Sequence, residues 1–240
     1  MTGKGARTRR RIVQCAATIL AERGVTGTNL SDVVQAAAVT KGALYFHFAS
    51  KDELILGVEL EYHADSHSML SEIETDPDPM RRLVKVTFAL LRRQLSNSLA
   101  QAHSRLMLAR VAPPLQSLLP VPPVDWPAVI LEWLTLASEQ AILPTGLDLD
   151  EVAETIDDCL VGAVTGHQVE HREVPPIRRI ALLWRMFLLP ALVPDVAHRA
   201  ALERLIEEES LRPPDTSDPD ELPGFADNGR PPRSLLEPAG

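Results

Sequence analysis

The sequence predicts an all-α protein, with a small three-helix domain at the N-terminus and a larger helical domain after it. Apolar residues recur at helical spacing along most of the chain, and residues suited to helix N-caps precede several of these segments. The composition, 45% hydrophobic and 24% charged, is ordinary for a globular protein. A chain of 240 residues is long enough to bury a core and to form one or two domains.

The first predicted helix covers residues 7–24, RTRRRIVQCAATILAERG. Its apolar residues share one face and are Ile12, Ala16, Ile19 and Leu20. Gly24 supplies a stop signal. The second helix follows within residues 28–39, where Thr28 is suited to the N-cap position. Its inward-facing residues are expected to be Leu30, Val33 and Val34.

The third helix is expected in residues 40–48, TKGALYFHF, with Thr40 as its N-cap. Such a short helix is marginal in water because nucleation is costly, so it must be anchored to the rest of the domain. The expected anchors are Leu44, Phe46 and Phe48. The side chains then left facing outward are Lys41, Tyr45 and His47. Ser50 and Glu53 have the spacing of a capping box, so a longer helix starts there.

Two short helices joined by a tight turn, with a third packed across them, form a helix-turn-helix arrangement. Gly42 lets the backbone approach a phosphate or a base edge closely. Residues 1–51 hold eight Lys/Arg and two Asp/Glu, 8 - 2 = +6, so the rest of a chain of net charge -9 carries -15. A basic head on an acidic body predicts local binding of a polyanion. A solvated basic terminus and a ligand-free aromatic cluster are the alternatives.

The block ATILAERGVTGTNLSDVVQAAAVTKGALYFHFASKDEL, within residues 7–60, resembles the DNA-binding domain of TetR-family transcriptional repressors. Its most specific part is VTKGALYFHFASKDEL. The resemblance implies an all-helical homodimer that binds a palindromic operator in double-stranded DNA and releases it when a small molecule enters the C-terminal domain. TKGALYFHF, together with the Trp in PPVDWPAV, is most similar to the γ-butyrolactone autoregulator receptors of antibiotic-producing actinomycetes. That subfamily implies quorum sensing and regulation of antibiotic biosynthesis.

The expected DNA-binding residues lie in and around the third helix. The inserted segment runs from Thr40 to His47, and the residues nearest the bases are Lys41 and Gly42. The residues expected on phosphates are Thr28, Tyr45, His47 and Lys51. Phosphate contacts set the register, whereas only base contacts carry sequence.

The body is expected to continue as helices within residues 78–99, 100–112, 127–143, 148–171, 175–192 and 195–210. Residues 148–171 and 175–192 are too apolar to be covered by their own chain, so they are the candidates for a four-helix dimer interface. The Pro-rich residues 113–127 predict an irregular connector on apolar surface. The last predicted helix ends in acidic residues, which suggests fraying. The expected domains are 1–50, helix-turn-helix; 51–211, ligand-binding and dimerisation; and 212–240, a disordered tail.

A ligand pocket in the body should be mostly apolar with a few fixed polar groups. Trp126 matches the Trp that lines the pocket of the butyrolactone receptors, so the resemblance implies that its indole contacts the ligand. Tyr62 lies on the helix that leaves the DNA-binding domain, and Thr165 could supply a hydroxyl. The alternatives are a core Trp under the connector, and a pseudo-receptor that responds to an antibiotic or to no small molecule.

The sequence contains no motif that indicates a catalytic site or a complete metal site. There is no G-x-S-x-G, Walker loop or dinucleotide glycine pattern, so we expect no catalytic residues and no cofactor. His63 and His67 are spaced for a metal, as are His167 and His171, but no third ligand is evident, so no metal is expected. Cys15 and Cys159 fit buried free thiols. No apolar run could span a membrane, so we expect a soluble cytoplasmic protein.

Overall fold

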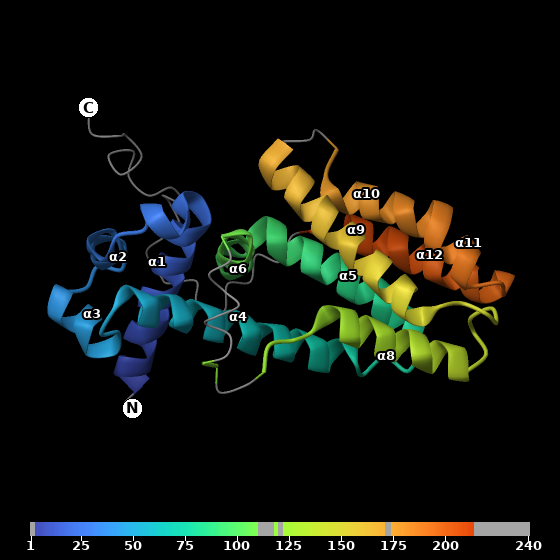
Figure 1. Cartoon of the computed structure of the whole chain (residues 1–240), viewed down its shortest axis with the longest axis horizontal. Helices are drawn as coiled ribbons and strands as arrows, with labels where there is room; N and C mark the ends of the chain where they lie inside the picture. Colours follow the sequence, from blue (N-terminus) through green and yellow to red (C-terminus); the bar gives the residue numbers. More distant parts are fainter. Residues whose placement is uncertain (1–2, 110–117, 120–121, 171–173, 214–240) are drawn as a thin grey trace. The chain divides into compact units, whose positions relative to one another are not determined.

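The computed structural model describes residues 3–109, 118–119, 122–170 and 174–213 (Figure 1). The helices are α1 (Gly3–Gly27), α2 (Leu30–Ala36), α3 (Lys41–His47), α4 (Lys51–Ile73), α5 (Pro79–Ser96), α6 (Ser98–Leu108), α8 (Trp126–Glu139), α9 (Leu149–Glu170), α10 (Pro176–Leu183), η1 (Trp184–Leu188), α11 (Leu189–Leu192) and α12 (Val196–Leu211). Within these residues there is no strand, so the all-α prediction is confirmed. None of the described helices combines the length and the apolarity needed to cross a membrane.

The chain divides into two compact units. The first contains α1, α2, α3, the part of α4 up to Glu59, and α6, whereas the second contains α4 from Leu60 onward, α5 and α8 to α12. The sequence placed the division at residue 50 and assigned residues 100–112 to the body. In the structure α6 packs along α1, and the Gln14 side-chain amide donates a hydrogen bond of 2.8 Å to the Ser98 hydroxyl.

The first unit has its own hydrophobic core. Its fully buried side chains include Ile12, Ala16, Leu20, Val33, Leu44, Phe48, Leu54, Val58 and Leu106. The backbone of α1 is interrupted at Gly24, which has φ 67°, a conformation that favours glycine. Thr28 was predicted to cap α2, but the N-cap residue is Asn29. One half of the predicted capping box is present, because the Glu53 N–H donates to the Ser50 hydroxyl at 3.1 Å, whereas the Glu53 carboxylate accepts the N–H of Ala49 at 2.6 Å rather than that of Ser50.

The second unit buries two tryptophans at the centre of its core. Trp133 of α8 and Trp184 of η1 are both 0% exposed. The Trp184 indole N–H donates a hydrogen bond of 3.0 Å to the Thr87 hydroxyl on α5. Cys159 of this unit and Cys15 of the first unit are free thiols, as predicted, but both are half-buried rather than buried.

Residues 175–192 were expected to form one long helix, and the structure corrects this. The regular helix α10 passes into the π-helical turn η1, in which the Leu189 N–H bonds to the Trp184 carbonyl. In a regular α-helix the ring of Pro190 would crowd the carbonyl four residues earlier, and proline has no N–H to donate. The wider π turn immediately before Pro190 therefore has a physical cause in the sequence.

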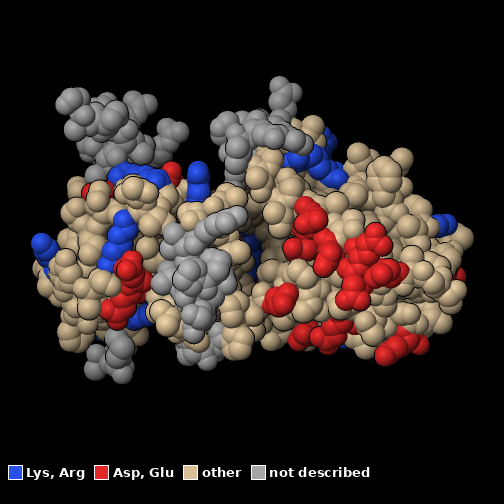
Figure 2. All heavy atoms as spheres, in the orientation of Figure 1, with Lys and Arg blue, Asp and Glu red and all other residues tan. Residues whose placement is uncertain are grey.

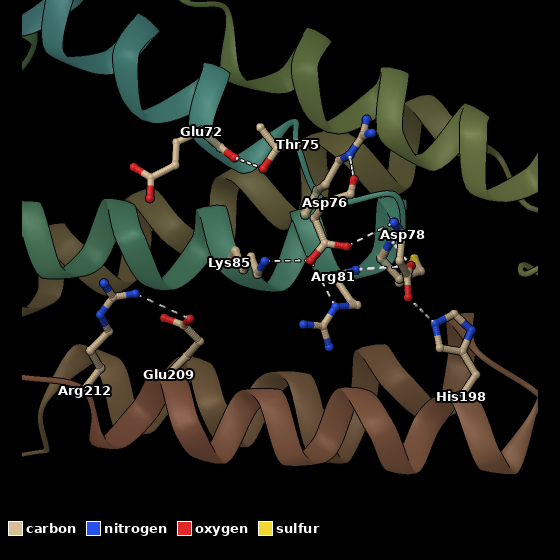
Figure 3. A network of polar contacts seen from close by, with 11 residues as sticks. Glu72, Thr75, Asp76, Asp78, Arg81, Lys85, His198, Glu209 and Arg212 are labelled. Atoms are coloured by element: carbon tan, nitrogen blue, oxygen red, sulfur yellow. Dashed lines mark hydrogen bonds and ion pairs between the residues drawn. The ribbon is translucent and has the colours of Figure 1, made fainter.

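Charged side chains fix the turn between α4 and α5 (Figure 3). Asp78 caps α5 by accepting the Met80 N–H at 2.9 Å, and it also bonds His198 of α12 at 2.7 Å. Asp76 accepts from Arg81 at 3.0 Å and from Lys85 at 2.6 Å. Burial raises the pKa of Asp76, but the hydrogen bonds from Lys85, the Asp78 backbone and Arg81 outweigh it and lower the pKa below its ordinary value.

The C-terminal end of α12 is held in place, so the predicted fraying is wrong. Glu209 is 8% exposed and its carboxylate lies 2.7 Å from the Arg92 guanidinium. Arg92 also donates to the Glu209 carbonyl at 3.1 Å. An unfavourable charge at a helix end is offset by a buried partner from α5. Residues 214–240 of the predicted tail lie outside the described residues, and so do residues 110–117 and 120–121, which include part of the predicted connector.

Candidate nucleic-acid interface

Helix α3 is anchored by two side chains, not three. Leu44 is 0% exposed and Phe48 is 1% exposed, as predicted, but Phe46 is 81% exposed. The three residues alternate in sequence, and with 3.6 residues per turn alternating positions cannot share one helical face. Leu44 and Phe48 are four apart and do share a face. The prediction that Phe46 anchors the helix is therefore wrong.

Two residues that sequence reasoning missed hold Phe48 in place. The Arg9 guanidinium of α1 lies 5.0 Å from the centre of the Phe48 ring. On α4, a Cβ added to Gly57 would come 2.7 Å from the ring edge of Phe48, so glycine is needed for this close approach. Phe48 is the C-cap residue of α3. The ring therefore ties the end of α3 to both α1 and α4.

Lys41 and Gly42, predicted nearest the bases, and Tyr45 and His47, predicted on phosphates, all lie on α3. Lys41, Gly42 and Tyr45 are exposed, and His47 is half-buried. The Lys41 ammonium lies 6.0 Å from the centre of the Tyr45 ring. The Thr40 side chain accepts the Ala43 N–H at 3.1 Å, which confirms Thr40 as the N-cap.

Two of the predicted phosphate contacts make internal hydrogen bonds instead of lying free on the surface. Thr28 is 2% exposed and its hydroxyl donates to the Gly24 carbonyl at 2.7 Å. The half-buried Lys51 ammonium donates to the Val25 carbonyl. Both groups bond carbonyls in the last turn of α1, at and just after its interruption at Gly24. An ammonium has two further N–H groups, so a phosphate contact by Lys51 stays a prediction.

Charge is distributed unevenly between the units. In the first unit, the exposed basic residues include Lys4, Arg7, Arg10 and Lys41. In the second unit, Asp and Glu side chains gather over α9 and its neighbours on the face that Figure 2 shows. Their exposed members on and just before α9 are Asp148, Asp150, Glu151, Glu154 and Asp158. A basic surface attracts phosphates, and acidic surface elsewhere limits indiscriminate adsorption to DNA.

The predicted ligand-binding residues all lie on helices of the second unit. Trp126 begins α8 and is a partly buried member of the core. Tyr62 is 7% exposed, and its ring lies 5.4 Å from the Arg93 guanidinium. Thr165 is half-buried on α9. The structure gives no contact that joins Trp126, Tyr62 and Thr165, so a pocket shared by them stays a prediction.

Sequence reasoning missed two further polar groups of the second unit. The indole N–H of Trp133 is buried and has no acceptor among the described residues, which is uncommon in folded proteins. Burial raises the pKa of Asp157 on α9, and the neighbouring charges of Asp158 and Asp125 raise it further. Asp125 is the N-cap residue of α8 and precedes Trp126 directly. No sequence signal distinguishes either group, because both effects come from tertiary packing.

A capped, anchored helix-turn-helix unit beside a separate helical body is the arrangement of helix-turn-helix DNA-binding proteins. Residues 12–58 match the family described as "Bacterial regulatory proteins, tetR family", and residues 78–194 match "Tetracyclin repressor-like, C-terminal domain". The chain belongs to the TetR family of transcriptional regulators.

Relatives along most of the chain are γ-butyrolactone receptors and similar regulators. The A-factor receptor protein of Streptomyces griseus is 28% identical over 209 residues, covering 85% of this chain and 69% of that protein. A solved gamma-butyrolactone receptor described as ArpA like is 30% identical with a TM-score of 0.71, covering 86% of this chain and 98% of that one. CprB from Streptomyces coelicolor, solved in complex with its biological operator sequence, is 29% identical with a TM-score of 0.70, covering 87% of this chain and 99% of that one.

Proposed function

We propose that the protein is a ligand-responsive transcriptional repressor, which binds a palindromic operator as a dimer and is released by a small diffusible signal. The γ-butyrolactones are the foremost ligand class, followed by butenolides and furans. The observation that carries the DNA-binding part is the exposure of Lys41, Gly42 and Tyr45 on a helix that Leu44 and Phe48 hold rigidly. The relatives named above support the receptor part.

At the DNA, α3 enters a major groove with Lys41 and Gly42 nearest the bases. An ammonium can donate to the O6 and N7 acceptors of guanine, and the missing side chain at Gly42 removes a steric barrier to the base edges. Tyr45, His47 and Lys51 contact phosphates and set the register, while the buried Thr28 acts through the backbone that it fixes. With few groups at the bases, dimer spacing and DNA shape supply much of the specificity.

The dimer forms through the second unit. Several large apolar side chains are more than half exposed there, and those on the helices predicted to form the interface are Val161 at 55%, Leu182 at 59%, Met186 at 61% and Phe187 at 64%. They lie on α9, α10 and η1, and α10 packs against both α9 and η1. A second copy that covers this surface would give the two-helix by two-helix interface that the sequence predicts.

Release by a ligand requires a differential affinity for two states of the dimer. A ligand bound near Trp126 lowers operator affinity if it prefers a state of the dimer in which the spacing of the two α3 helices does not match the two half-sites. By linkage, the operator lowers the affinity for the ligand by the same factor. Typical couplings are about 1–3 kcal/mol per site. The second candidate function, a regulator that responds to an antibiotic or to no small molecule, keeps the same DNA-binding unit. The full burial of Trp133 and Trp184 in the core of the second unit favours it.

The experiment combines one operator with two variants. The operator is selected from fragments of genomic DNA by the wild-type protein, and binding is followed by fluorescence anisotropy with and without a synthetic 2-acyl-γ-butyrolactone. Lys41→Ala should weaken operator binding and flatten base preference. Trp126→Ala should still bind the operator but resist release. If the wild-type protein selects no DNA, the proposed repressor function is refuted. If it binds the operator but the lactone does not release it, the second candidate function is supported instead.

A further inference from the structure

Phe46 has the largest exposed fraction of the exposed large apolar side chains among the described residues, at 81%. It lies on α3, the helix that carries the exposed Lys41 and Tyr45. An exposed apolar ring forgoes burial for no gain in the stability of the monomer. Phe46 also lies next to Tyr45, which is 45% exposed, so α3 presents two adjacent exposed rings, and apolar surface gathered on the proposed recognition helix points to a contact made on binding.

The direction of the ring is set by the helix and by His47. Phe46 follows the buried Leu44 by two residues, which places it about 200° further around the helix, on the side facing away from the core. Gly42 lies one turn earlier on that same side, so no side chain shields the ring there. The His47 ring meets the Phe46 ring edge to face, with centres 5.1 Å apart and planes at 80°. This contact restricts the ring to few rotamers.

The binding partner of α3 determines what the ring can touch. The inference rests on the proposed function, in which this side of α3 faces the major groove. Among the base edges in that groove, the one apolar group is the C5-methyl of thymine. The other groups that project there are hydrogen-bond donors and acceptors, which a phenyl ring cannot satisfy, and the C–H edges of the bases offer a ring less apolar surface than a methyl group does. We infer that Phe46 is a specificity-determining residue that packs on a thymine methyl in each half-site of the operator.

The expected effect is small for one contact and is measurable as a change in Kd. Burial of one methyl group corresponds to about fourfold in affinity. Replacing that thymine by uracil, which lacks the methyl, should therefore weaken wild-type binding about fourfold in each half-site. Phe46→Ala should weaken binding to thymine-containing DNA and should be insensitive to the replacement, because the two changes remove the same contact.

The test is a double-mutant cycle on DNA selected from a random pool by the full-length protein. Each thymine is replaced by uracil in turn, and Kd is measured by fluorescence anisotropy at fixed salt for wild type, Phe46→Ala and Leu211→Ala. Leu211 is a matched control because it is 78% exposed but lies on α12 of the second unit. Equal thermal midpoints for the variants exclude misfolding, as expected for an exposed side chain.

The result that supports the inference is coupling of Phe46, and not of Leu211, to one thymine per half-site. Wild-type binding that no uracil replacement weakens, or weakening that persists unchanged in Phe46→Ala, would overturn it. The inference would also be overturned if the selected operators lacked thymine in either half-site. Failure of the wild type to bind any duplex would instead refute the proposed function, so the two failures are distinguishable.

Discussion

Substituting Gly57 by alanine tests whether the Phe48 ring fixes the recognition helix. The new Cβ would lie 2.7 Å from one ring carbon of Phe48 and 3.3 Å from the next. The ring is 1% exposed and has the Arg9 guanidinium 5.0 Å from its centre, so it has little room to yield. Overpacking of this kind costs about 1–3 kcal/mol. Replacing a helical glycine by alanine stabilises by about 0.8–1 kcal/mol.

The net expectation for Gly57→Ala is a loss of about 1 kcal/mol, or about 2–4 °C in thermal midpoint for a chain of this size. The assay is thermal unfolding followed by far-ultraviolet circular dichroism. Gly42→Ala is the matched control in the same unit, because a Cβ there meets one atom, the Thr40 hydroxyl, at 4.0 Å. It should keep the midpoint or raise it slightly, because alanine favours the helix and meets no clash there, while weakening operator binding. A Gly57→Ala midpoint equal to or above that of wild type would refute the reasoning.

Three further substitutions probe the second unit. Glu209→Gln should lose about 3 kcal/mol in urea unfolding, because it leaves the buried Arg92 without its charge partner; a loss under about 1 kcal/mol would contradict the pairing. The lowered pKa of Asp76 means that its contribution to stability is present above the unfolded pKa of about 3.9 and is lost as pH falls through the lower folded pKa. Asp76→Asn should therefore be less stable than wild type at pH 7, with the difference closing below about pH 4; a constant difference across that range would exclude the linkage. Phe187→Glu should give monomers in light scattering after size exclusion, because its 64% exposed ring lies on the proposed dimer surface, and an unchanged dimer would move the interface elsewhere.

Features set by neighbouring residues were predictable from the sequence. The N-cap at Thr40 and the bond from the Glu53 N–H to the Ser50 hydroxyl follow from a few consecutive residues, and both are present. The stop at Gly24 is likewise local, because only glycine adopts its positive φ readily. Amphipathic spacing also predicted where the helices lie. It did not predict the end of α10, which depends on how Pro190 alters the preceding turn.

Features set by distant residues were not predictable in the same way. Phe46 is an exception, because the four-residue spacing of Leu44 and Phe48 already separates it from them by helical periodicity, and the structure confirms that separation. The approach of Gly57 to the Phe48 ring joins α4 to the end of α3. The assignment of α6 to the first unit depends on packing against α1, far away in sequence. Thr28 and Lys51 looked like surface groups but bind backbone carbonyls.

The most direct test of the central claim is a methylation-protection footprint of the full-length protein on its selected operator. Dimethyl sulfate reports the N7 atom of guanine in the major groove, where α3 is proposed to lie. The account predicts two symmetric patches of protection, separated by about one helical turn or a multiple of it, that weaken together in Lys41→Ala. Guanine N7 atoms that stay fully reactive when the protein is bound, or a single protected patch without two-fold symmetry, would contradict it.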